Sequence, residues 1–478
     1  MSSSSVAIPI APNTSISEIQ EAFRRQQQNK QQVKNMSIDA RLKKAQALSQ
    51  WITTHRKDIQ DALYADFKKP PIQTDFTEIY PVTSEIKHYK ENLHEWVAER
   101  EVDTPLVFFG SSASIVTEPK GNVLVLSPWN YPFQISLKNA IGAFLAGNTV
   151  IIKPSEFTPH TSAIIKRAVQ ENFSANEMLV IEGDHTVATA LLQLRFNHIH
   201  FTGSPAIGKT IMKAAAENLA TITLELGGKT PVIVDETADL KHAVHNLIFA
   251  KYTNNGQTCI AADYILVQEK NKDRLVEMLA EEIRKTIGDG RAEGGQNCVM
   301  VNQRHYQRVK CLLEDALQKG ARVYSGGQLD EADRYIAPTL LTDVPPNALI
   351  LQEEIFGPLL PIITYKNLDE AIAYINQGET PLALYIYSKS RRNKKQIIQN
   401  TTAGATLINE SLIHNGHPNL PFGGLNNSGI GKSHGHFGFK EFTHERPIVR
   451  AWNAPSKLLT PPYNGFKRKV VDFMLKYL

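Results

Sequence analysis

Cysteine is scarce in this sequence. Only three occur in 478 residues, Cys259, Cys298 and Cys311, and no two of them form a Cys-x-x-Cys pair. An odd number of cysteines at long spacings argues against a disulfide framework and against a zinc site, and it favours a reducing, cytoplasmic compartment. We expect no metal centre, and we expect Cys298 and Cys311 to be buried structural residues.

Long apolar runs and an excess of one charge are also missing. No stretch approaches the ~20 apolar residues that cross a bilayer. The net charge of +4 is weak for this length, so it gives no reason to expect nucleic-acid binding. Residues 1–13 are rich in serine and have neither a basic start nor an apolar core, unlike a secretion signal. We expect residues 1–16 to form a flexible arm.

The composition, with 42% hydrophobic and 21% charged residues, is typical of a globular protein. The length of the chain indicates two or three domains. Helical patterns run from Ser17, which has capping-box spacing to Gln20, to about Arg100. Short apolar runs then alternate with helices, which predicts an α/β fold with two doubly wound parallel sheets and a cleft between them. The predicted strands cover 121–127, 148–153, 178–182, 197–202, 230–235 and 264–268, and the predicted helices cover 162–172, 187–192 and 240–252.

Two predicted strands end in residues suited to a ligand with phosphate and ribose groups. Gly203 allows close approach to the backbone, and Ser204 and Pro205 suit the start of a helix whose N-terminus could receive a diphosphate. Lys153 and Glu156 follow another strand end, where open α/β sheets bind ligands. Taken alone, the first pattern also fits an ordinary strand-to-helix turn, and the second fits a surface ion pair.

Three more residues could carry chemistry. Cys259 lies in a small polar turn, residues 254–260, and a thiolate is a strong nucleophile near neutral pH. Glu225 is flanked by leucines, so its pKa could be raised enough for it to act as a general base. The Asn130 amide, held between prolines and aromatic residues, could donate to a developing oxyanion. Each also has an ordinary interpretation: a buried cysteine, a solvated glutamate and a rigid packing loop.

In this order the motifs resemble those of the aldehyde dehydrogenase superfamily, over roughly residues 16–463. Within it the chain most resembles class 3, because of its short N-terminus, His434-Gly435, residues 442–447 (Phe-Thr-His-Glu-Arg-Pro) and a tail containing Pro461-Pro-Tyr463. The sequence of residues 425–427 (Leu-Asn-Asn) departs from the smaller residues that relatives often carry. The matching stretches are SPWNYP (127–132), IKPSE (152–156), FTGS (201–204), LELGGK (224–229), GQTC (256–259), EEIFGP (353–358) and PFGGLNNSG (421–429).

The resemblance implies a role for each matching residue. Cys259 matches the nucleophile, Glu225 the base that activates hydrolytic water, and Asn130 the oxyanion donor, which works with the backbone N–H of Cys259. NAD or NADP is the implied cofactor, and apolar aldehydes of medium or long chain, aromatic or polyene (apocarotenoid), are the implied substrates. The implied cofactor contacts are Lys153 and Glu156 at the adenosine ribose, Gly203 and Ser204 at the diphosphate, Glu354 and Phe356 at the nicotinamide ribose, with Trp129 and Gly227 in the same site.

The resemblance also implies a division of the chain. Residues 17–100 and 119–224 are expected to form the cofactor-binding domain, and residues 225–420 the catalytic domain. Residues 101–118 and 421–460 are expected to form a small β element that joins two subunits into a homodimer, because exposed strand edges invite pairing. Residues 461–478 are left as a C-terminal tail.

Three rival functions are open at this point. A CoA-acylating aldehyde dehydrogenase would not hydrolyse the thioester, and Glu225 argues against it. A cofactor-free cysteine esterase or hydrolase is weakened because no Cys–His–Asn/Asp order is evident near Cys259. A non-catalytic protein on the same fold is disfavoured by the intact set of Cys259, Glu225 and Asn130. The histidine pairs 198/200 and 434/436 lack a third metal ligand, which favours structural roles.

The tail from Gly465 to Leu478 predicts a basic amphipathic helix. Its apolar residues fall on one face, and four basic residues against Asp472 give a local charge of +3 (4 − 1). At ~21 Å such a helix is too short to cross a bilayer. It could lie in a membrane interface, giving a peripheral membrane contact, or it could pack on the protein over the substrate entrance.

Overall fold

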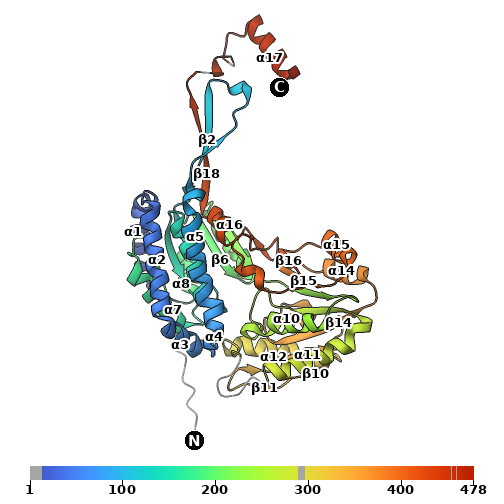
Figure 1. Ribbon diagram of the computed structural model, residues 1–478. Coiled ribbons are helices and arrows are strands. Elements are labelled where there is room, and N and C mark those ends of the chain that lie inside the picture. The colour runs from blue at the N-terminus through green and yellow to red at the C-terminus, as the bar shows by residue number, and fades with distance from the viewer. Residues whose placement is uncertain (1–12, 289–296, 454, 459, 478) are drawn as a thin grey trace.

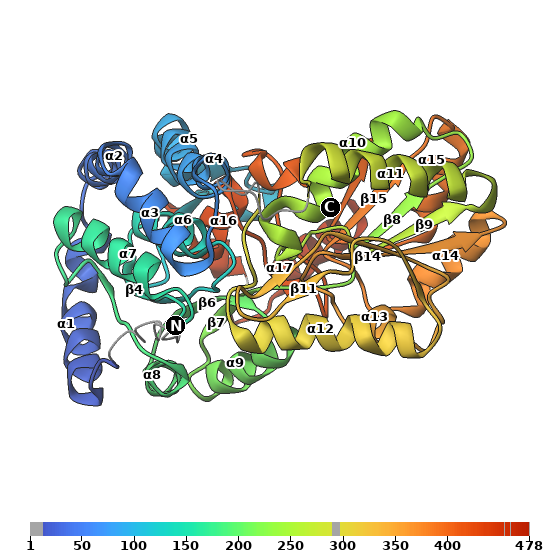
Figure 2. The ribbon, with the colours of Figure 1, turned by 90° about the horizontal axis from the view of Figure 1, so that it is seen from below.

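The computed structural model describes residues 13–288, 297–453, 455–458 and 460–477. They form two α/β lobes and a narrow arm that extends away from both (Figure 1). Seen from below, the lobes lie side by side, and helices flank the strands in each (Figure 2). The predicted fold class, two doubly wound sheets with an additional β element, is confirmed.

The N-terminal lobe contains a six-stranded sheet in the order β17-β7-β6-β3-β4-β5. Only β17 runs antiparallel to its neighbour, and the other pairs are parallel. Val123 and Val125 pack on one face against helices α2, α3, α5, α6 and α7, while Leu124 and Leu126 pack on the other face against α1, α8 and α9. The strands are β3 (Asn122–Leu126), β4 (Thr149–Lys153), β5 (Met178–Val180), β6 (His198–Gly203), β7 (Thr221–Leu226) and β17 (Gly429–Ile430). The helices are α1 (Ile16–Lys34), α2 (Ile38–Thr54), α3 (Arg56–Phe67), α4 (Pro71–Thr74), α5 (Tyr80–Val97), α6 (Pro132–Leu145), α7 (Pro159–Asn172), α8 (His185–Leu192), α9 (Pro205–Glu217) and α16 (Gly435–Glu441).

The C-terminal lobe contains a seven-stranded sheet in the order β10-β13-β14-β9-β8-β15-β16, in which only β10 is antiparallel to its neighbour. Alternating residues again divide between two cores, since Val232 packs with α10 and α11 and Ile233 packs with α14 and α15. The strands are β8 (Pro231–Val234), β9 (Tyr264–Gln268), β10 (Arg322–Ser325), β13 (Thr339–Thr342), β14 (Leu359–Tyr365), β15 (Ala383–Tyr387) and β16 (Ala405–Ile408), with a separate hairpin of β11 (Leu329–Asp330) and β12 (Tyr335–Ile336). The helices are α10 (Leu240–Tyr252), α11 (Lys272–Thr286), α12 (Gln303–Gln318), α13 (Leu349–Gln352), α14 (Leu368–Gln377) and α15 (Arg391–Asn400).

The structure corrects the expected start of the first helix. The capping box is formed by Ser15 and Glu18 and not by Ser17 and Gln20, so α1 begins at Ile16, one residue before Ser17. Residues 1–12 of the flexible arm expected over 1–16 lie outside the described residues. Residues 13–15 are held on the lobe: the Asn13 side chain accepts a hydrogen bond from the N–H of Asp184, and Thr14 donates to the carbonyl of Glu182.

The expected domain boundary at 224/225 falls inside strand β7. The backbone of Glu225 therefore belongs to the sheet of the N-terminal lobe. Residues 429–441 also belong to this lobe and not to the joining element, because β17 pairs with β7, and α16 packs against α5 and α6. The chain thus returns to its first lobe late in the sequence. The resemblance had implied that this segment belongs to the joining element.

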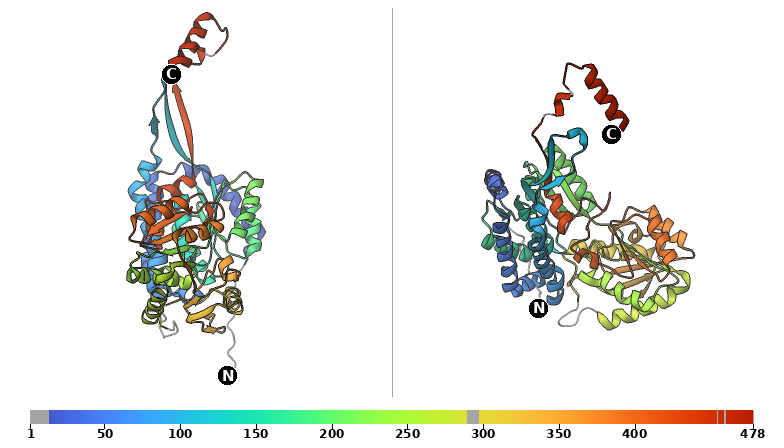
Figure 3. Two further views of the ribbon diagram at one scale, coloured as in Figure 1. Left: turned by 90° about the vertical axis from the view of Figure 1, so that its right-hand side faces the viewer. Right: turned by 45° about the horizontal axis from the view of Figure 1, so that its top comes forward.

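The arm is a three-stranded antiparallel sheet in the order β1-β2-β18 (Figure 3). It consists of β1 (Arg100–Val102), β2 (Ser111–Pro119) and β18 (Thr443–Ala451), and β2 and β18 pair along nine residues. Helix α17 (Gly465–Tyr477) lies at the tip, away from both lobes (Figure 1). No described residue of α17 is buried, so the alternative that the tail packs over its own chain's entrance is wrong. Among the described residues, no helix has the length and hydropathy needed to cross a membrane.

Candidate active site

The turn that carries Cys259 is held in an unusual backbone conformation between α10 and β9. Asn254, Asn255 and Gly256 all have left-handed φ angles, of 56°, 54° and 72°. At Gly256 a Cβ atom would collide with the carbonyl of Gly357, so this position requires glycine. The turn therefore brings Cys259 to the boundary between the lobes.

Asn130 is fixed against the same turn by a pair of amide hydrogen bonds. The side-chain Nδ2 of Asn130 donates to the backbone carbonyl of Gln257 at 3.0 Å, and the backbone carbonyl of Asn130 accepts from Nδ2 of Asn254 at 2.9 Å. The hydroxyls of Tyr131 and Thr258 lie 2.7 Å apart beside it. A side-chain amide has two N–H groups, so Asn130 keeps one donor for a further partner.

Glu225 is 4% exposed, and burial raises its pKa to about 8, against the opposing effects of the Ser433 hydrogen bond and nearby Lys432. Ser433 donates to Oε1 at 2.8 Å, while Oε2 is buried without a hydrogen-bond partner. The carboxyl group therefore exists in both protonation states close to neutral pH. It has one oxygen available to accept a proton.

Cys259 is partly exposed, unlike Cys298, which is buried. Burial, followed by the neighbouring Glu354 and Glu225 carboxylates, raises the pKa of the Cys259 thiol to about 12. The thiol is thus protonated in this arrangement and needs a base to become a nucleophile. The expectation of a buried structural role is wrong for Cys311, whose side chain is exposed on α12: the apolar residues of that helix face the core at helical spacing, and Cys311 lies off that face.

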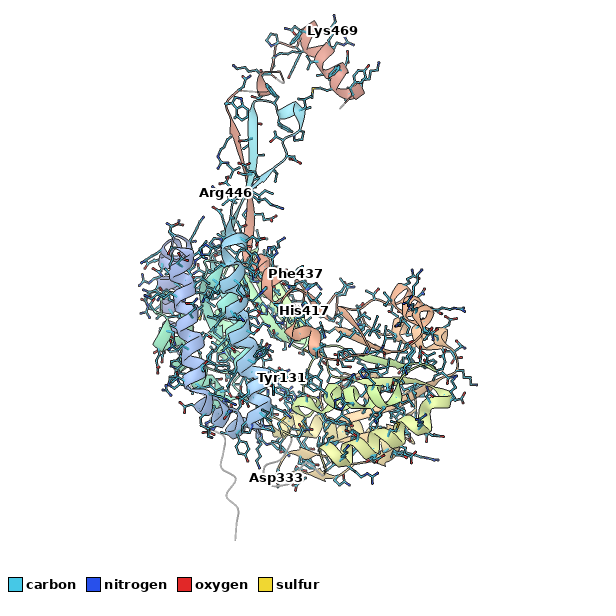
Figure 4. The ribbon with its side chains drawn as sticks, viewed as in Figure 1. Tyr131, Asp333, His417, Phe437, Arg446 and Lys469 are labelled. Carbon is cyan, nitrogen blue, oxygen red and sulfur yellow. The ribbon has the colours of Figure 1, made fainter. Side chains whose placement is uncertain are left out.

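A cavity of about 680 Å³ joins Cys259 and Glu225 to the surface, within the size range of small-molecule sites. Its walls are formed by α4, α5, α6, α10 and the loop around residues 412–418. Tyr131, in its lining, lies in the region between the two lobes (Figure 4). The apolar lining residues are Ile72, Phe76, Ile135, Phe249, Ile260, Leu412, Ile413 and Phe422.

The start of helix α9 offers unpaired N–H groups to an anion. Ser204 is the N-cap and Pro205 the first helical residue, as predicted, but the Ser204 side chain makes no capping hydrogen bond. The backbone at Gly203 is approached so closely by the ring of Phe201 that a Cβ atom would not fit. Lys153 and Glu156 form an ion pair of 2.8 Å at the end of β4, and Lys153 is 6% exposed.

A second group of expected cofactor residues surrounds the loop before β14. At Gly227 a Cβ atom would collide with the carboxylate of Glu354, whose Oε1 has no hydrogen-bond partner. Burial raises the pKa of Glu354 to about 8. Trp129 and Phe356 meet edge to face, with ring centroids 5.3 Å apart. An extended dinucleotide fits these donors and this tight glycine backbone, since diphosphate prefers helix N-termini and ribose hydroxyls pair with carboxylates.

Several residues near the site were not identified from the sequence. His305 of α12 lies 4.6 Å from the ring of Trp129, and burial lowers its pKa to about 4. Lys229 binds the carbonyls of Ile350 and Glu353, and so fixes the loop that carries Glu354. For Lys229, its place in the LELGGK stretch was a usable signal. For His305 no local signal exists, because it is brought in by a distant helix.

In each of the two histidine pairs, one ring forms a hydrogen bond to a polar side chain of the protein. His198 bonds the hydroxyl of Thr221 at 2.8 Å, and His434 bonds the side-chain oxygen of Asn415 at 2.7 Å. Within the described ranges, no group of three or more His, Cys, Asp or Glu side chains is placed to hold a metal ion.

Known proteins with similar sequences or structures match most of the length of this chain. The profile of the aldehyde dehydrogenase family matches residues 5–448. The 4,4'-diaponeurosporen-aldehyde dehydrogenase of Staphylococcus aureus is 44% identical over 438 residues, covering 91% of this chain and 94% of that protein. The aldehyde dehydrogenase family 3 member A2 of Rattus norvegicus is 39% identical, covering 91% and 90%. The substrate-bound structure of AldH from Staphylococcus aureus superimposes with a TM-score of 0.91 at 42% identity, covering 95% of this chain and 99% of that one.

Proposed function

The chain belongs to the aldehyde dehydrogenase family and is a class 3-like member of it, and we propose that it oxidises apolar aldehydes to carboxylic acids through a covalent intermediate on Cys259. The observation that carries the proposal is that Cys259 and Glu225 line the same, largely apolar cavity. A nucleophile and a base with a pKa near 8 share one water-accessible space, which hydrolysis of an acyl intermediate requires.

The first half of the reaction forms the covalent bond. The Cys259 thiol gives its proton to water in the cavity, and its sulfur attacks the aldehyde carbon, giving a thiohemiacetal. Asn130 donates its remaining amide N–H to the oxyanion, together with the backbone N–H of Cys259, and this stabilises the charge that develops in the transition state. The bound NAD or NADP supplies the hydride acceptor, and loss of hydride leaves a thioester on Cys259.

The second half releases the product. Glu225 takes a proton from water, and the hydroxide attacks the thioester carbonyl. The C–S bond of the resulting adduct breaks and releases the carboxylic acid, and the proton held by Glu225 passes to the Cys259 sulfur. A base in this cavity argues against the CoA-acylating alternative, in which the thioester is not hydrolysed.

The cofactor would occupy the cleft side of the N-terminal sheet. In the proposal, Lys153 and Glu156 hold the adenosine ribose, and Gly203, Ser204 and the N-terminus of α9 receive the diphosphate. Glu354 and Phe356 contact the nicotinamide ribose. Trp129 and Gly227 complete the site, since the ring of Trp129 packs on Phe356, and Gly227 lies against the Glu354 carboxylate.

The cavity walls indicate a long apolar substrate. Towards solvent the lining includes Ile72, Phe76, Tyr80 and Ile413, which are 58–69% exposed. Exposed apolar side chains that continue an apolar cavity mark a binding surface. The distal part of a long fatty or polyene chain would lie on these residues and cover them.

A substrate panel tests the proposed substrate class. With saturating NAD or NADP, hexadecanal should show a higher kcat/KM than octanal, and glycolaldehyde should be poor. Phe76→Ser should raise KM for hexadecanal about tenfold, because the bound chain loses one aromatic contact of ~1.4 kcal/mol. The KM for octanal should be unaffected. Ile398→Ser, at a residue 46% exposed outside the cavity, is the control. Equal kcat/KM values for all three aldehydes would contradict the proposed class.

A further inference from the structure

A buried polar chain connects the base to a histidine that the proposed reaction does not use. Ser433 Oγ lies 2.8 Å from Oε1 of Glu225 and 3.2 Å from Nε2 of His200. Ser433, Glu225 and His200 are 3%, 4% and 1% exposed. Each link is long-range in sequence, since Ser433 is 208 residues from Glu225 and 233 from His200.

Strand register explains why these residues meet. In the parallel pair β6 and β7, His200 lies opposite Thr223, and Glu225 follows two residues later on β7. Side chains two apart on a strand share a face, so His200 and Glu225 lie on the same face of the sheet. Strand β17 pairs with β7 at Glu225, and the chain that leaves β17 carries Ser433 over that face.

The hydrogen atoms of this chain can be assigned from its donors and acceptors. An ionised Glu225 only accepts, so Ser433 must donate its single hydroxyl hydrogen to it. The Ser433 oxygen is then available to accept from His200. Burial lowers the pKa of His200 to about 3, so the ring is neutral and carries one N–H, which this network places on Nε2. The other nitrogen, Nδ1, has no hydrogen-bond partner.

We propose that His200 is a positioning residue for hydrolysis of the acyl-enzyme: through Ser433 it fixes the ionised Glu225 carboxylate by Oε1 and leaves Oε2 free to take a proton from water. The proposal rests on the proposed function of Glu225 as the base. His200 is not itself among the residues that line the substrate cavity. It reaches Glu225 through Ser433, which does line the cavity.

The other charged groups around this chain have partners of their own. Lys432 donates to the carbonyls of Gly423 and Gly424, and Glu441 accepts from Thr223. These bonds do not pass through Ser433 or His200, so they persist when either is replaced. The remaining titratable groups that face Glu225 or His200 are Cys259, His198 and His434, and, across a small cavity beside His200, Glu85, Tyr89 and Lys138.

The experiment measures hydrolysis of an acetyl-enzyme against pH. The full-length protein is treated with 4-nitrophenyl acetate, which transfers its acetyl group to a thiol and releases 4-nitrophenolate, so that the initial burst reports acylation and the steady rate reports hydrolysis. Ser433→Ala should shift the pH midpoint of the steady rate up by about one unit, because a hydrogen bond to a charged group favours that charge by about this amount. His200→Phe should shift the midpoint in the same direction by about half a unit. Both bursts should keep their wild-type size.

The double variant makes the test specific to the chain of contacts. Because His200 acts through Ser433, the variant with both Ser433→Ala and His200→Phe should shift the midpoint no further than Ser433→Ala alone. His198→Phe is the matched control, since His198 is equally buried on the same strand and bonds Thr221 instead; it should keep the wild-type midpoint. Ser433→Thr, which keeps the hydroxyl, should also keep it. If His200→Phe does not fold, His200→Leu carries the same prediction.

A wild-type midpoint in a folded His200 variant, or shifts that add in the double variant, would overturn the inference. Its failure is distinct from failure of the proposed function. If Glu225→Gln hydrolyses the acetyl-enzyme normally, Glu225 is not the base. If Glu225→Gln stalls while His200→Phe keeps the wild-type midpoint, only the role of His200 is wrong.

Discussion

At the scale of single residues, the ionisation of Glu225 is the property that most directly controls turnover. Its pKa is raised to about 8 by burial, and only the ionised form can accept a proton from water. The steady-state rate with octanal should therefore increase through pH 8 and level off above it. A stopped-flow pH series checks this, and a rate limited by hydrolysis that stays flat between pH 6.5 and 9 would contradict it.

Much of the residue set could be predicted from the sequence, because it lies in contiguous motifs. The neighbouring residues in the sequence predict Cys259 as a nucleophile and Glu225 as a base, and both residues line one cavity in the structure. Asn130 is held against the cysteine turn by its own amide. Ser433 and His200 could not be predicted, because their contacts depend on strand register and on where a two-residue strand, β17, attaches.

At the scale of elements, the boundaries of the buried strands were the most predictable feature, since an apolar run between turn residues has few alternatives. Strand β9 and helix α10 fall where expected, at 264–268 and 240–252. The start of α1 was displaced because Ser15 and Ser17 both suit an N-cap, and only the Ser15 hydroxyl meets a matching Glu18. The choice between the two serines is therefore made by the local capping box.

Helix α17 is the element whose role most needs a test. It presents exposed Phe466, Phe473 and Leu475 beside four basic residues, and Lys469 projects at the tip of the molecule (Figure 4). We expect peripheral, salt-sensitive binding to anionic vesicles, because an amphipathic basic helix gains both apolar burial and charge attraction there. Liposome flotation should show full-length protein on phosphatidylserine vesicles at low salt, and a version ending at Asn464 should remain unbound.

The flotation test has two controls and a contradicting outcome. Neutral phosphatidylcholine vesicles and high salt are the controls, and both should reduce flotation of the full-length protein. Equal flotation of the full and shortened proteins, or none of either on anionic vesicles, would show that α17 does not anchor the protein.

At the scale of the whole molecule, the arm predicts a homodimer. Strands β2 and β18 extend away from both lobes, and the outer edge of β18 pairs with no strand among the described residues (Figure 3). The segments expected to join the subunits are those around 101–118 and 441–453. Phe109, just before β2, and Trp452, just after β18, are 73% and 72% exposed. Exposed apolar side chains beside an open strand edge favour association. Light scattering at micromolar concentration should give twice the mass of 53.3 kDa.

Substitutions on the arm and on the C-terminal lobe test and control the homodimer prediction. Trp452→Glu should shift the protein towards a monomer, whereas Ile398→Glu, on an exposed face of the C-terminal lobe, should leave the mass unchanged. A wild-type protein that is monomeric under these conditions would contradict the proposed assembly.

The central claim is that one cavity supports both formation of an acyl group on Cys259 and its hydrolysis by Glu225. The most direct measurement is rapid mixing of Glu225→Gln with octanal and cofactor, followed by intact mass and peptide mapping. We expect a burst of reduced nicotinamide close to one per active site, a steady rate reduced by about 10²–10⁴-fold as for loss of a general base, and an octanoyl group on Cys259. Cys298→Ala should behave as wild type, and Cys259→Ala should show neither burst nor adduct. Normal steady turnover of Glu225→Gln without a trapped acyl group, or turnover by Cys259→Ala, would contradict the account.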